Sequence, residues 1–169
     1  MSQLTYIIFA VLSVHFVPIQ RTPVLTTPDL KAVANCLMQK LTTEQNLDSL
    51  MGNKWALVYH TDDRCDGSTD GSIENLSPEQ VNGEITLFVS NDGAGWACTP
   101  KDPSKYMHAF SLQLLVKEWD RMEISELDEA NNHFTLIGRG ESDYLRVFCF
   151  DFDGKFLISK LEYRSEDPG

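Results

Sequence analysis

The sequence predicts an all-β fold, a closed up-and-down barrel of eight antiparallel strands that follows a short N-terminal helical segment. Three observations favour this class. Segments with apolar residues at alternate positions recur along most of the chain, turn-type sequences separate them, and one segment with helical spacing precedes them. A closed barrel leaves no sheet edge exposed, and eight strands enclose enough room for one small ligand. A β-sandwich is the structural alternative.

Length and charge limit the classes of protein to consider. The 169 residues suffice for one domain, and a hydrophobic content of 42% with 23% charged residues is typical of a globular protein. The net charge of -11 disfavours nucleic acid as a partner, because nucleic-acid binding needs a basic surface to neutralise phosphates. It also disfavours anionic membrane surfaces.

An apolar run at residues 6–17 has the length of a signal-peptide core and is too short to span a membrane. We therefore expect a secreted protein without stable membrane insertion, cleaved between Ser13 and Arg21. A buried N-terminal strand or helix is the alternative. The expected organisation is a signal peptide over 1–20, a helical segment within 21–51 and the barrel over 52–169.

The helical segment is predicted by apolar residues three and four positions apart, with Asp29 placed to cap the N-terminus. These apolar residues are Leu30, Val33, Ala34, Leu37, Met38 and Leu41. The barrel strands are predicted at 52–61, 72–76, 84–90, 109–117, 120–127, 133–137, 143–151 and 155–163. A long connection at 91–105 carries Trp96 and Cys98, and Asp153-Gly154 is a typical hairpin turn.

The first strand opens with a tryptophan. Trp55, Leu57 and Tyr59 alternate and therefore lie on one face of this strand. Trp55 is expected to plug one end of the barrel, and the alternative is an ordinary core tryptophan.

The cysteines indicate disulfides rather than a metal site. Four cysteines are spread widely with no C-x-x-C pair, so we expect no zinc site, and two disulfides fit an oxidising compartment. Sequence spacing leaves three connectivities open. The triplet Asn75-Leu76-Ser77 is a sequon, so Asn75 is a candidate glycosylation site.

Three motifs in order resemble the lipocalin family of the calycin superfamily. Gly52 and Trp55 are similar to its G-x-W strand with one additional residue, and Ser142-Asp143-Tyr144 is similar to its T-D-Y motif. Arg164 is similar to the arginine that ends the eighth strand. The chain ends at Gly169 without the family's C-terminal helix, so we expect a short variant or a truncated chain.

The resemblance implies further contacts. Arg164 would stack on Trp55, and a disulfide would join Cys36 to Cys149, which leaves Cys65 to pair with Cys98. The alternative for Arg164 is a solvated surface position. The barrel flank without its helix would be polar, or covered by the N-terminal helix or by a second subunit, so a homodimer is one option.

The expected ligand site is the barrel interior. If Cys149 points outward to reach Cys36, then Tyr144, Arg146 and Phe148 point inward, and Arg146 needs a partner such as a ligand carboxylate. The alternatives are a rim position for Arg146 or a pairing with Glu162 or another internal acid. Trp96 is either a lid or a residue tucked against the exterior. The predicted ligand contacts are Leu57, Tyr59, Trp96, Phe110, Leu112, Leu114, Met122, Ile124, Phe134, Arg146 and Phe148.

The expected function is a secreted carrier of a small hydrophobic ligand, such as a fatty acid or retinoid, with an anionic group as one option. The alternative is a secreted protein-interaction module, an inhibitor or matrix component, that uses the barrel loops. The sequence has no G-x-S-x-G motif and its four histidines are scattered, so we expect neither an enzyme nor a cofactor.

Overall fold

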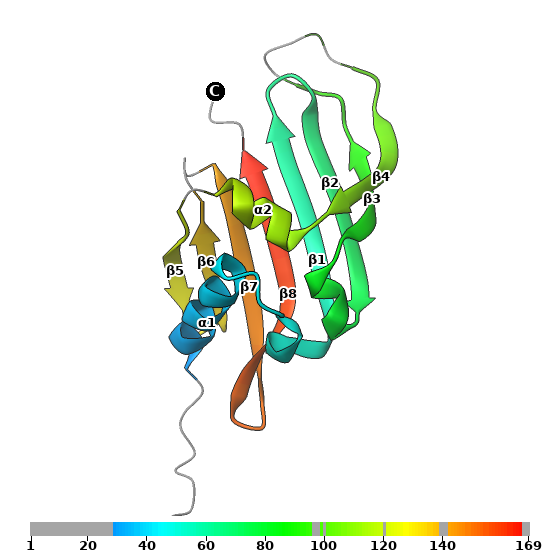
Figure 1. The fold of residues 1–169 in the computed structure, drawn as a ribbon. Coiled ribbons are helices and arrows are strands. Elements are labelled where there is room, and N and C mark those ends of the chain that lie inside the picture. Colours follow the sequence, from blue (N-terminus) through cyan, green and yellow to red (C-terminus); the bar gives the residue numbers. More distant parts are fainter. Residues whose placement is uncertain (1–28, 96–98, 100, 120, 139–141, 167–169) are drawn as a thin grey trace, which may run out of the picture.

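The computed structural model describes residues 29–95, 99, 101–119, 121–138 and 142–166, which form one eight-stranded sheet with helices on one of its faces (Figure 1). The predicted signal peptide and Trp96 lie outside the described residues. The strands are β1 (Met51–Asp63), β2 (Gly67–Leu76), β3 (Ile85–Asn91), β4 (Ser104–Phe110), β5 (Glu123–Asp128), β6 (His133–Ile137), β7 (Asp143–Phe152) and β8 (Lys155–Glu166). The helices are α1 (Leu30–Thr42), α2 (Leu112–Glu118) and the 3-10 turns η1 (Asp48–Leu50) and η2 (Pro78–Asn82).

The strand order is β4-β3-β2-β1-β8-β7-β6-β5, so the first and last strands pair at the centre and β4 and β5 are the edges. The β1–β8 pair is parallel, with Leu57 opposite Leu161, and every other pair is antiparallel. The prediction of a closed antiparallel barrel is therefore wrong. The predicted all-β class with a short helix is confirmed, but the sheet is mixed and open.

The error arises at residues 109–117, predicted as one strand. In the structure β4 ends at Phe110, and the hydroxyl of Ser111 accepts a hydrogen bond from the Leu114 backbone N–H to cap α2. Leu112 and Val116 are buried whereas Leu114 is 59% exposed. This is the spacing of a helix, because a strand would put all three side chains on the same face.

The helix changes the direction of every later strand relative to the barrel prediction. In a continuous meander of eight strands, the last runs antiparallel to the first. Here α2 connects β4 to β5, and these two strands form the opposite edges of the sheet (Figure 1). The strand pairings show that β4 and β5 run in the same direction. β8 consequently returns parallel to β1, which joins two four-stranded meanders at the centre.

The predicted N-terminal helix is confirmed. α1 begins after Asp29, whose carboxylate accepts from the backbone N–H of Ala32 at 3.1 Å. Its apolar face packs toward β5, β6 and α2. The Asp153-Gly154 hairpin is also confirmed, since both residues have positive φ between paired Phe152 and Lys155.

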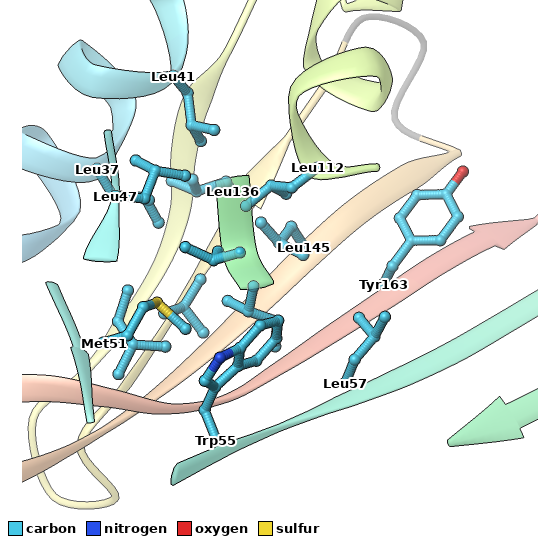
Figure 2. Close-up of a cluster of buried hydrophobic side chains, with 14 of the residues drawn as sticks. Leu37, Leu41, Leu47, Met51, Trp55, Leu57, Leu112, Leu136, Leu145 and Tyr163 are labelled. Carbon is cyan, nitrogen blue, oxygen red and sulfur yellow. The ribbon is translucent and has the colours of Figure 1, made fainter. Parts of the chain in front are cut away.

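The hydrophobic core lies between the helices and the sheet. Figure 2 shows Leu37 and Leu41 of α1 and Leu112 of α2 among side chains that include Leu145 and Trp55 from the strands. Trp55 is 2% exposed, and its indole Nε1 donates to the carbonyl of Ser77 at 2.8 Å. Trp55 thus anchors the start of β1 to the segment that follows β2.

The sheet is strongly curved on the β1–β4 side. The ring of Tyr59 on β1 lies 4.4 Å from that of His108 on β4, although two strands separate them in the sheet. Gly71 lies opposite Tyr59 and close to β3, because a Cβ at Gly71 would lie 2.6 Å from a side-chain carbon of Val89. The absence of a side chain at Gly71 lets β3 fold in towards the core.

Candidate functional site

The orientation of β7 determines where the predicted anion-binding residue lies. Leu145, Val147 and Cys149 are buried in the core, so the alternate residues, including Arg146, lie on the opposite face of the sheet. We call this face, on which none of the described helices lies, the outer face (Figure 1). The prediction that Arg146 points into a barrel is wrong, since the sheet buries the apolar set and leaves the guanidinium outside.

The inward orientation of Arg146 was predicted on the condition that Cys149 points outward to form a disulfide with Cys36. Cys36 and Cys149 are free thiols in the structure, so the expected Cys36–Cys149 bridge is absent. Burial of Cys149 raises the pKa of its thiol to about 12. Cys65 is disulfide-bonded, but Cys98, its expected partner, lies outside the described residues.

Three cations, Arg146, Lys160 and Arg164, lie near the carboxylate of Glu162. We call Arg146, Lys160, Glu162 and Arg164 the cationic cluster. Arg164 donates from both Nε and Nη2 to Oε1 of Glu162, at 3.0 and 2.8 Å. Lys160 places its Nζ 3.5 Å from Oε2 of the same carboxylate. Glu162 is only 7% exposed, so both cations pair with a nearly buried charge.

These contacts keep Glu162 ionised. Burial by itself raises the pKa of the Glu162 carboxyl, but the Arg164 hydrogen bonds and the charges of Lys160, Arg164 and Arg146 lower it below its usual value. The same pairing raises the pKa of Arg164. One negative and three positive charges leave the cluster with a net charge of +2, on a protein whose total is -11.

Arg146 is the cation with donors to spare. It lies directly opposite Glu162 on β8 and opposite Thr135 on β6. Its Nη2 lies 3.9 Å from Oε2 of Glu126, which is beyond hydrogen-bond distance. Its Nε is buried without a hydrogen-bond partner among the described residues. A guanidinium has five N–H donors, and because the Arg146 side chain is 34% exposed, its Nη donors can still bind an acceptor from solvent.

Two aromatic rings of β7 contact the cations of the cluster. Lys160 Nζ lies 3.7 Å above the ring centroid of Phe148, and the guanidinium carbon of Arg146 lies 5.8 Å from that of Tyr144. Such cation–π contacts hold the charged groups close to the sheet surface. Phe150 continues the same stripe, half-buried, two residues after Phe148.

Acidic residues border the cluster at the β5 edge. Oε2 of Glu126 accepts from the hydroxyl of Thr135 at 2.9 Å and lies 3.6 Å from Nε2 of His133. Nδ1 of His133 is buried and has no hydrogen-bond partner in the described chain. Its ring lies 5.3 Å from that of Phe148. Glu126 is 47% exposed at its side chain and is held by Thr135, so Arg146 is not its hydrogen-bond donor.

The predicted stacking of Arg164 on Trp55 does not form. Trp55 is in the core with Leu57, whereas Arg164 lies opposite His60 on the outer face and binds Glu162. Asp143 begins β7 and Tyr144 pairs with Arg164 and Ile137 in the neighbouring strands.

The predicted ligand wall is divided between the core and the surface. Leu57, Phe110, Leu112 and Phe134 are buried in the core, and Leu114 is exposed. Tyr59, Met122 and Ile124 are partly buried and pack against the core. Two further predicted contacts, Arg146 and Phe148, lie on the outer face.

Sequence reasoning missed Lys160 as a member of this site and named Glu162 only as an alternative partner of Arg146. The signal was available, because Lys160, Glu162 and Arg164 alternate with Leu161 and Tyr163, which is typical of a strand with one polar face. Arg146 and Thr135 join them only through the pairing of β6, β7 and β8.

The described residues contain no group of three or more metal-ligating side chains placed to hold an ion. Among the described helices, none has the length and hydropathy needed to cross a membrane. Asn75, the candidate glycosylation site, is exposed at the end of β2 with a positive φ of 59°.

Comparison with known proteins assigns no family. No family model matches the chain, and no curated protein matches it. A crystal structure of a DUF4783 family protein from Bacteroides ovatus is similar at 12% sequence identity, over 75% of this chain and 91% of that one, with a TM-score of 0.37. The lipocalin assignment is wrong, because the sheet is mixed and open whereas a lipocalin barrel is closed and antiparallel.

Proposed function

We propose that this protein is a secreted binding protein, without enzymatic activity, that holds a small amphipathic anion on the outer face of its sheet. The carboxylate or similar head group binds Arg146, beside Lys160 and Arg164. The apolar part of the ligand lies along Phe148 and Phe150. The observation that carries the proposal is the guanidinium of Arg146, with unused donors between aromatic rings in a patch of net positive charge.

Electrostatics supports an anion at this place. The acidic surface elsewhere repels an anion, whereas the cationic cluster attracts it, so the protein's own field favours one binding position. Glu162 does not prevent binding, because Arg164 and Lys160 already pair with its charge. Binding replaces the long contact between Arg146 and Glu126 with shorter, charge-assisted hydrogen bonds.

The apolar stripe supports an amphipathic rather than a purely inorganic anion. From Arg146 to Phe150 the strand rises about 13 Å, at roughly 3.3 Å per residue. Phe152, 58% exposed, extends the stripe, and its ring lies 6.4 Å from that of Phe150. Aromatic side chains left partly uncovered on a sheet face are typical of a ligand contact.

A matched set of ligands and variants tests the site. Dodecanoate and dodecanol share a tail and differ in head-group charge, so calorimetric titration should detect binding of the first and weaker binding of the second. Arg146→Met should weaken dodecanoate about 10–100-fold, the usual value of charge-assisted hydrogen bonds. Arg121→Met is the control, because Arg121 is an exposed arginine that pairs with Glu123 away from the cluster. Equal affinities for the wild type and the Arg146 variant would disprove the site.

Secretion is tested separately. The Cys65 disulfide supports an oxidising compartment, because such bonds are rare in reducing ones. The full chain expressed in a secretory host should reach the medium shortened by removal of residues up to a point between Ser13 and Arg21. Intracellular retention with an intact N-terminus would contradict secretion without affecting the binding proposal.

A protein-interaction module is the second candidate. The exposed pair Phe88 and Met107 on β3 and β4 favours it, at 55% and 60% exposure. Native mass spectrometry of protein from its own source separates the two candidates, because a small molecule bound to the wild type supports the first and an empty protein supports the second.

A further inference from the structure

We infer that the β4 edge pairs with β4 of a second copy of this chain, antiparallel and centred on Met107, to form a symmetric dimer with a continuous sheet. β4 lies at the end of the strand order, and β3 is its strand partner in the described chain. Residues 104–107 are exposed along this edge. An uncovered edge strand offers its free N–H and C=O groups to another strand.

The sequence of β4 is compatible with antiparallel pairing to a second copy of β4. In an antiparallel pair centred on Met107, Lys105 lies opposite Ala109 of the partner subunit, and Tyr106 lies opposite His108 of the partner subunit. No two like charges face one another in this register. The two-fold axis makes the contact isologous and closed, so it produces a dimer rather than a filament.

The exposed apolar residues fit the same axis. Phe88 and Met107 are directly opposite in the β3–β4 register and therefore share the outer face. With the axis at Met107, these side chains and their counterparts in the partner subunit form one apolar row across four strands. The row contains two of the largest exposed hydrophobic side chains of the described residues and brings Met107 into contact with its counterpart in the partner subunit.

The opposite edge of the sheet is not suited to pairing. β5 carries Glu123, Glu126 and Asp128 in six residues, so a second β5 would bring carboxylates together. Charged residues on an edge strand are a common protection against edge pairing. β4 has a single charged side chain, Lys105, away from the axis.

The test is sedimentation velocity over a hundredfold range of concentration at low salt, with charge variants at Ala109. Ala109→Glu places a carboxylate opposite Lys105 of the partner subunit and should tighten the dimer, whereas Ala109→Lys should weaken it. Two symmetric charge pairs make an about tenfold difference in dimer Kd between these variants. The difference should shrink in 1 M salt.

Net charge alone predicts the reverse order, because the lysine variant reduces the repulsion between two acidic subunits. Ser125→Glu and Ser125→Lys, at an exposed position of β5, are the controls and report that general effect. Met107→Lys is a second disrupting variant, with like charges face to face at the axis. A monomer at all concentrations, or a dimer that responds equally at residues 109 and 125, would overturn the inference.

Discussion

Arg146 and Glu162 lie directly opposite one another on β7 and β8, yet Glu162 receives its hydrogen bonds from Arg164 while Arg146 lies 3.9 Å from Glu126. The carboxylate therefore fixes one arginine and leaves the other with unused donors. This division makes Glu162 a structural group and Arg146 the candidate ligand contact, and the two roles predict different effects of substitution.

Glu162→Gln should change the dependence of stability on pH. The pKa of Glu162 in the folded protein is below its ordinary value of 4.5, so its ionised form stabilises the fold above about pH 4.5. This contribution is lost as the pH falls through the folded pKa. The variant should be less stable at pH 7 and converge with the wild type in acid, as measured by urea unfolding. Glu74→Gln, which removes a charge outside the cluster, is the control, and a gap that persists in acid would contradict the assignment.

The two free thiols should differ in reactivity. Burial and a pKa of about 12 should protect Cys149 of the folded protein from alkylation at pH 8, whereas half-buried Cys36 should react. Intact mass should increase by one label in the native protein and two in denaturant without reductant. Protection of both thiols until a reductant is added would instead indicate the Cys36–Cys149 bridge.

Two leucines of α2 should respond differently to truncation. Leu112→Ala removes a buried side chain and should cost about 2–5 kcal/mol, whereas Leu114→Ala, at an exposed position, should stay within about 0.5 kcal/mol. Urea unfolding of the two variants measures the difference. Equal losses of stability would instead support the strand that the alternating pattern of this segment predicts.

Trp55 should stabilise the fold by both packing and hydrogen bonding. Trp55→Phe keeps a ring but leaves the Ser77 carbonyl without the indole donor, at a cost of about 1–3 kcal/mol. Trp55→Ala also opens a cavity and should cost about 3–5 kcal/mol. The free energies of unfolding test this order. A phenylalanine variant as stable as the wild type would show that the hydrogen bond to Ser77 does not contribute to stability.

Local elements could be predicted from the sequence where their signals lie within a few residues. Asp29 and the spacing after it specify α1, and Asp153-Gly154 specifies the hairpin between β7 and β8. Alternation correctly placed Leu57 in the core and, read on β8, puts Lys160 on the polar face. These features depend on backbone conformation and side-chain periodicity, which neighbouring residues decide.

The topology and the site depend on tertiary contacts that the sequence pattern does not specify. The residues at 109–117 fit both periods, and burial of Leu112 against the core, with Leu114 left in solvent, selects the helix that keeps the sheet open. Strand pairing then brings Arg146 beside Glu162 on the outer face, because burying Leu145 and Val147 stabilises the fold more than burying a guanidinium. Both outcomes depend on the free energies of contacts between residues that are distant in sequence. A local sequence pattern does not contain this information.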